Sequence, residues 1–189
     1  MKVHQRTRLF FSSILASLFL FIGSGAPALA IPFSAVDIQG TVGTASGASQ
    51  AMVVIDWDTD SFAWLFEWNG PATYADAYDA ILAAEGGNFS WSQAAFVLDM
   101  SYTTGGQTYS TGSPGWLSFW SSADGSSWST TNLGVYDEPM VNGGWAGAQA
   151  NLPEIWPGSA PTVPIPEPGT ALLMTLGLAM LSIKRNARA

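Results

Sequence analysis

Residues 51–68, AMVVIDWDTDSFAWLFEW, decide the fold. The first part, 51–57, is rich in Val and Ile, and the last part, 62–68, alternates large aromatic side chains with others; both patterns are typical of β-strands. Residues 58–61 between them, DTDS, favour a turn. The stretch therefore predicts a β-hairpin. By the two-residue period of a strand, one face of its second strand carries Phe62, Trp64, Phe66 and Trp68.

A helix is predicted over 74–85, directly after the hairpin. Thr73 and Asp76 have the spacing of a capping box, and Gly86 and Gly87 provide a stop at the C-terminal end. More strands are expected at 95–102, 115–121, 126–130 and 145–149. The order of hairpin, helix and strands predicts an α+β fold, in which one helix packs across a mostly antiparallel, β-grasp-like sheet.

The predicted α+β domain spans residues 51–151, with irregular segments on both sides. Residues 31–50 are expected to be a lead-in loop, because 40–50 are small and polar. Residues 152–165 contain closely spaced prolines and are expected to form a stiff, extended stalk.

The beginning of the chain is typical of a secretory signal peptide, residues 1–30. Lys2, Arg6 and Arg8 precede an apolar run over 9–22, and Ala28 and Ala30 form a small-residue cleavage site. The alternative, a permanent membrane anchor, is less favoured because the run is shorter than the roughly 20 residues that span a bilayer. We therefore expect signal peptidase to cut after Ala30 and the body to be exported.

The end of the chain carries a second targeting pattern, over 166–189. Pro166, Glu167 and Pro168 precede an apolar run over 169–183, and Lys184 and Arg185 follow it. The positive-inside rule places these cations on the cytoplasmic side of a membrane helix, with the body outside.

The combination in residues 166–189 resembles the PEP-CTERM sorting signal of bacterial envelope proteins. The resemblance implies an inner-membrane-anchored precursor that an exosortase, a membrane protease or transpeptidase, cuts near the Pro-Glu-Pro motif. The product would then stay on the cell surface or be secreted. Because exosortase systems are associated with extracellular polysaccharide and surface layers, the resemblance also implies a surface or biofilm role.

The charge of the body is unusual. All six Lys and Arg, and the single His, lie in the two targeting segments, so residues 31–168 carry fourteen acidic side chains and no basic one. Such a body would repel nucleic acid, which is bound through Lys and Arg. It also lacks the His, Cys or Lys of the usual serine, cysteine and Schiff-base enzymes.

A carboxylate cluster at the hairpin suggests a calcium site. Asp56, Asp58, Asp60 and Glu67 fall at positions 1, 3, 5 and 12 of an EF-hand loop. Against this, position 6 is Ser61 rather than Gly, and strands flank the loop, so a plain hairpin is favoured. A looser calcium site that uses Asp56, Asp58 and Asp60 remains open.

The tryptophans offer a second possible site. Exposed rings in a row are platforms for sugars or planar ligands, although Trp is buried on average and most are expected to be structural. The candidates for ligand binding are Trp57, Trp64, Trp68, Trp116 and Trp120. The spacing of Gly and Trp residues over 115–145 also resembles a small exported β-grasp-like domain of the type appended to cobalamin-binding proteins.

Catalysis is the least favoured function. Asp99, Asp124, Asp137 and Glu138 could supply a pair of carboxylates for glycoside hydrolysis, but no spacing selects a pair. We therefore expect a non-enzymatic, exosortase-processed surface or matrix protein with an acidic, Trp-rich body. The alternative is a calcium-assisted module that binds carbohydrate or a small ligand.

Overall fold

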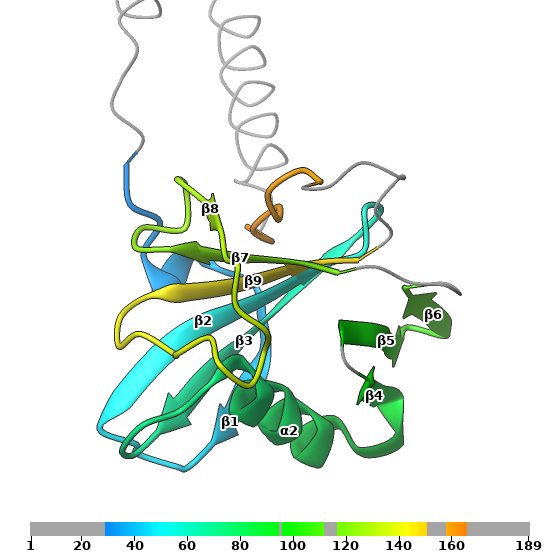
Figure 1. The fold of residues 1–189 in the computed structure, drawn as a ribbon, viewed down its shortest axis with the longest axis horizontal. Helices are drawn as coiled ribbons and strands as arrows, with labels where there is room; N and C mark the ends of the chain where they lie inside the picture. The colour runs from blue at the N-terminus through cyan, green and yellow to red at the C-terminus, as the bar shows by residue number, and fades with distance from the viewer. Residues whose placement is uncertain (1–28, 95, 112–116, 151–157, 166–189) are drawn as a thin grey trace, which may run out of the picture.

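The computed structural model describes residues 29–94, 96–111, 117–150 and 158–165. Figure 1 shows a large sheet, a smaller sheet and one long helix, α2 (Tyr74–Glu85). The strands of the large sheet, in spatial order, are β1 (Ile38–Gly43), β3 (Ser61–Trp68), β2 (Ser49–Asp56), β9 (Trp145–Gln149), β7 (Ser118–Ser122) and β8 (Ser129–Thr130). Those of the smaller sheet are β4 (Phe89–Ala94), β5 (Phe96–Thr104) and β6 (Gln107–Ser110).

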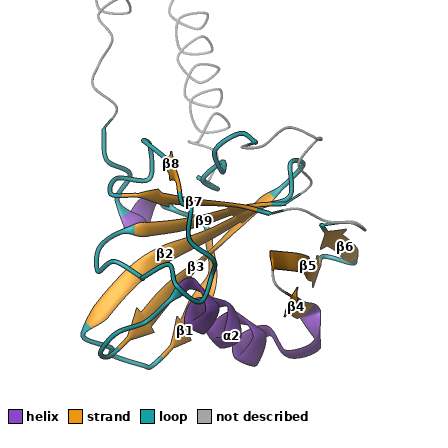
Figure 2. Ribbon diagram, viewed as in Figure 1, coloured by secondary structure: helices purple, strands orange, loops and turns teal. Residues whose placement is uncertain are grey.

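The predicted α+β class is confirmed, since the fold is mostly sheet with one α-helix (Figure 2). The large sheet is mixed. β2 and β3 form the predicted antiparallel hairpin, whereas β9 runs parallel to β2, and β7 runs antiparallel to β9. The smaller sheet is antiparallel throughout.

The predicted lead-in loop over 31–50 is wrong in part. It contains a short 3₁₀ helix, η1 (Phe33–Ala35), and β1, which pairs in parallel with β3 at the edge of the large sheet. Exposure alternates along β1, but Val42 is its single buried residue and Gly40 and Gly43 have no side chain, so the hydrophobic signal of the strand is weak.

The helix begins and ends where its capping residues predict. Thr73 and Asp76 form the capping box, and the backbone N–H of Gly86 donates to the carbonyl of Leu82. The N–H groups of Tyr74 and Ala75 donate to the carbonyls of Glu138 and Val135. All four N–H groups at the start of the helix, from Thr73 to Asp76, thus have acceptors, and the loop that contains Val135 and Glu138 is fixed to the helix.

One face of the large sheet packs against α2 and the smaller sheet. The aromatic side chains of β3 lie on this face, as predicted, and belong to the same core cluster as Tyr78 and Ile81 of α2. Tyr102 of β5 stacks on Trp57 and meets Trp64 edge to face, with ring centroids 6.3 and 5.2 Å apart. The smaller sheet therefore covers aromatic surface that a single sheet and helix would leave exposed. A 3₁₀ turn, η2 (Gly86–Asn88), joins it to α2.

The opposite face is covered by the two ends of the body. The N-terminal segment (residues 29–36) packs Phe33 against Trp145, and the C-terminal segment (residues 158–165) packs Val163 into the same cluster. The two segments also meet, because the N–H of Asp37 donates to the carbonyl of Pro164 at 2.9 Å. The stalk predicted over 152–165 is thus, in its described part, a segment that lies against the sheet.

The predicted signal helix and membrane helix lie in residues 1–28 and 166–189, outside the described residues. Within the described ranges, none of the helices has the length and apolar character needed to cross a membrane.

Candidate functional site

The tryptophans singled out as a binding platform are buried. Trp57, Trp64, Trp68 and Trp120 are between 0 and 8% exposed. Trp116 lies outside the described residues. The prediction of an exposed aromatic row is therefore wrong for the four described residues, because the smaller sheet, the helix and the end segments cover both faces of the large sheet.

The indole N–H of Trp64 is buried and therefore needs a hydrogen-bond acceptor. Its indole N–H donates to Oε1 of Glu85 at 2.9 Å, and the hydroxyl of Tyr102 donates to Oε2 of the same carboxylate at 3.5 Å. Burial and the nearby Glu85 carboxylate raise the pKa of Tyr102 above its usual value. Glu85, the last residue of α2, thus joins the helix, β3 and the smaller sheet.

Asp56 is the buried member of the predicted calcium cluster. Its Oδ1 accepts the N–H of Asp58 at 2.8 Å, and its Oδ2 accepts the N–H of Thr162 at 2.7 Å. Both oxygens are thus engaged by backbone donors, one in the hairpin turn and one in the C-terminal segment.

Of the other carboxylates of the proposed EF-hand loop, two are exposed and one has a hydrogen-bond partner of its own. Asp58 and Asp60 are exposed in the turn, where Asp58 has a φ of +67°. Glu67 accepts the N–H of Ser46. In the part of the chain that the structure describes, no three His, Cys, Asp or Glu side chains gather in a group that could hold a metal ion. Calcium binding stays a hypothesis.

The predicted processing sites lie at the limits of the described chain. Ala30 is exposed and directly precedes Ile31, whose N–H donates to the carbonyl of Asp124. Ala28 and the sorting residues Pro166, Glu167, Pro168, Lys184 and Arg185 lie outside the described residues.

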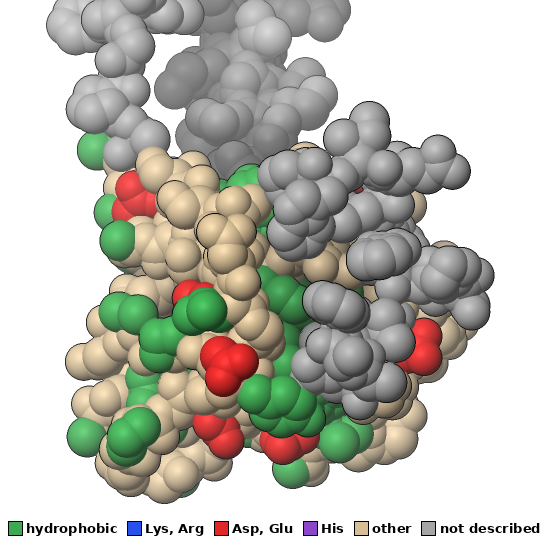
Figure 3. Space-filling model, viewed as in Figure 1, with side chains coloured by type: hydrophobic (Ala, Val, Ile, Leu, Met, Phe, Trp, Pro, Cys, Tyr) green, Lys and Arg blue, Asp and Glu red, His purple; other side chains and the backbone are tan. Residues whose placement is uncertain are grey.

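Of the carboxylates proposed for catalysis, Asp124 has a structural role. Asp124 is tied into its turn, because Oδ1 accepts the N–H groups of Ser126 and Ser127 at 2.8 and 2.7 Å. These bonds hold the pKa of Asp124 well below its usual range, which makes it unsuitable as a general acid. On the face drawn in Figure 3 the carboxylates are dispersed among polar and hydrophobic side chains.

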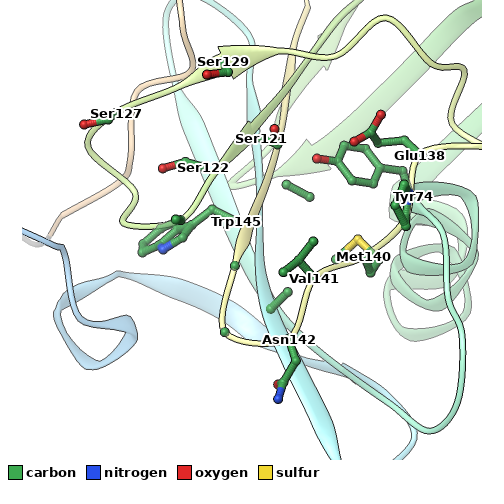
Figure 4. A pocket seen from close by; sticks show the side chains of 16 residues that line it. Tyr74, Ser121, Ser122, Ser127, Ser129, Glu138, Met140, Val141, Asn142 and Trp145 are labelled. Carbon is green, nitrogen blue, oxygen red and sulfur yellow. The ribbon is translucent and has the colours of Figure 1, made fainter.

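The structure reveals one site that the sequence did not indicate, a trough of about 490 Å³ between two turns. Figure 4 shows Tyr74 and Glu138 close together on one side of it, and Ser122, Ser127 and Trp145 on the other. Its lining comes from β7, β8, the start of β9 and the loop over 138–144. Ala51 of β2 and Tyr74 of α2 complete the lining from distant parts of the sequence, and the serines carry no signal of their own.

Comparison of the chain with protein-family models, curated proteins and solved structures found no match.

Proposed function

We propose that this chain is an exported protein, processed at both ends, whose acidic body is a non-catalytic structural module of the cell surface or extracellular matrix. Signal peptidase would remove residues 1–30, and an exosortase would act on an inner-membrane-anchored precursor near Pro166. The observation that carries the proposal is the complete segregation of Lys and Arg into the two end segments.

The burial of the four described tryptophans that were candidates for ligand binding favours the structural role over an aromatic binding surface. A platform for sugars needs several exposed rings in one patch, whereas Trp57, Trp64, Trp68 and Trp120 serve the core. With no cysteine in the chain and no cation in the body, this core supplies the stability that disulfides or ion pairs supply elsewhere. Any contact with extracellular polysaccharide would then use other parts of the surface.

We also propose that the fold is β-grasp-like. The supporting observation is the order of elements: the β2–β3 hairpin, then α2, then β9 inserted in parallel beside β2 and flanked by antiparallel β7. Relative to a β-grasp fold, β1 and β8 are additions at the edges of the large sheet, and the smaller sheet is an addition over one of its faces.

The sorting proposal is tested by expressing the full chain in an exosortase-positive host and in a host without exosortase. Mass spectrometry of the extracellular protein should find Ile31 at its N-terminus and no peptide beyond the region of Pro166. Replacement of Pro166, Glu167 and Pro168 by Ala should leave the protein in the membrane fraction with Lys184 retained. Replacement of Glu154 alone by Ala is the control and should be processed normally. Extracellular protein that keeps residues 184–189 would contradict the proposal.

A further inference from the structure

The trough between the β7–β8 turn and the loop over 138–144 has a preformed shape. On one side Asp124 fixes its turn through the N–H groups of Ser126 and Ser127. On the other side the N–H of Gly143 donates to the carbonyl of Gln50, and the N–H of Gln50 donates to Oδ1 of Asn142. Both rims are therefore held by hydrogen bonds before any ligand arrives, which lowers the entropic cost of binding.

The polar groups of the trough are available to a ligand. Within the described residues, the hydroxyls of Ser121, Ser127 and Ser129 and the carboxylate of Glu138 line the trough without an intramolecular hydrogen-bond partner. Tyr74 donates its own hydroxyl proton to the carbonyl of Trp120 at 2.9 Å. Burial, and then the nearby Glu138 carboxylate, raise the pKa of Tyr74, so its oxygen remains a neutral acceptor.

Of the remaining lining, Ser122 and Asn142 are polar but hydrogen-bond within the rims, and the apolar part includes Ala51, Met140, Val141 and Ala146. A ligand that suits the trough thus has hydroxyl groups that donate and accept along one edge and an apolar C–H surface along another. The trough volume of about 490 Å³ lies within the range of small-molecule sites, roughly 300–1,000 Å³, and is sufficient for one or two sugar rings.

The charge of the body decides which sugars fit. With a carboxylate in the trough and no basic side chain between residues 31 and 168, an anionic sugar would be repelled. We propose that the trough binds a neutral saccharide, whose hydroxyls would donate to Glu138 and exchange hydrogen bonds with Ser121, Ser127 and Ser129. This site is independent of the sorting signal, and its failure would leave the proposed export pathway untouched.

Three tetrasaccharides that differ in charge provide the test: neutral cellotetraose, anionic tetragalacturonate and cationic tetraglucosamine. Binding to the full-length chain is measured by saturation-transfer NMR and calorimetry in a non-glycosidic detergent, because a sugar headgroup would compete. We expect cellotetraose to bind and tetragalacturonate not to bind. Glu138→Gln should weaken cellotetraose binding by about tenfold, and Ser121→Ala with Ser129→Ala by about tenfold together.

Two matched controls separate the trough from the general surface. Asp137→Asn removes the same charge one residue away and outside the lining, and Ser34→Ala with Ser92→Ala removes two exposed hydroxyls elsewhere; both should leave binding unchanged. The proposal is overturned if cellotetraose does not bind, if tetragalacturonate binds as tightly, or if trough and control variants behave alike. Binding of tetraglucosamine alone, lost in Glu138→Gln but not in the serine variant, would indicate a cation site and also overturn it.

Discussion

The backbone N–H of Thr162 donates to Oδ2 of Asp56, 106 residues earlier, at a distance of 2.7 Å. This bond joins the C-terminal segment to the β2–β3 hairpin. Two further contacts hold the segment: Nε2 of Gln149 donates to Ser159, and Pro161 lies against Gly147. The buried carboxylate of Asp56, which was a candidate calcium ligand, thus binds backbone N–H groups of the hairpin turn and the C-terminal segment.

Replacing Asp56 by Ala should destabilise the protein by about 2–4 kcal/mol, because two N–H groups lose a charged acceptor. The midpoint of urea unfolding measures the loss. Asp37→Ala is the matched control, since the side chain of Asp37 is exposed, and it should change stability by less than about 0.5 kcal/mol. Equal effects of the two variants would show that the hydrogen bonds of Asp56 contribute little.

The calcium hypothesis predicts a rise in melting temperature in millimolar calcium beyond that in sodium chloride of equal ionic strength. Because backbone N–H groups already occupy both oxygens of Asp56, we expect the two salts to act alike. A calcium-specific rise that disappears when Asp58 and Asp60 are both replaced by Asn would instead establish a site at the turn.

Glu85 should stabilise the fold through its acceptor oxygens rather than its charge. Glu85→Leu would leave the buried indole N–H of Trp64 without its acceptor, and should cost about 1–3 kcal/mol. Glu85→Gln keeps an acceptor and removes a negative charge from a helix C-terminus, where the dipole disfavours it, so it should be nearly neutral. Thermal unfolding of both variants checks this difference; similar losses in both would assign the effect to charge.

Gly147 provides the space that the C-terminal segment occupies. A Cβ added there would lie 2.7 Å from Cγ of Pro161 and 2.8 Å from Cζ3 of Trp128. Gly147→Ala should therefore displace the segment at a cost of about 1–3 kcal/mol and increase amide exchange at Thr162. Gly87→Ala, which meets no atom within 4 Å, is the control and should leave that exchange unchanged.

The stabilisation that Asp124 provides should be lost in acid. Its folded pKa is lowered, chiefly by the N–H groups of Ser127 and Ser126, from the ordinary value of 3.8. The unfolded carboxyl therefore takes up its proton first as the pH falls, so the stabilisation is present above about pH 4 and is lost at lower pH. The difference in melting temperature between wild type and Asp124→Ala should shrink between about pH 5 and pH 2. A constant difference would contradict this.

The sequence predicts the parts of this fold that depend on local signals. The limits of α2 follow from Thr73, Asp76 and Gly86, and the hairpin follows from the period of 62–68. Alternation shows which side chains share a face but not what covers that face. The burial of Trp57 and Trp64 depends on Tyr102 of the smaller sheet, a contact between distant segments. The trough depends on how residues 121–146 fold back on one another and pack against Ala51 and Tyr74, for which there is no local signal.

The meeting of the two end segments brings both ends of the described body to the same side. Because Asp37 and Pro164 are hydrogen-bonded, the chain enters and leaves on one side, with α2 and the smaller sheet toward the other (Figure 1). An attachment at either end would hold the same side of the body toward the membrane. The surface of α2 would then point outward, away from the cell, whichever end carried the anchor.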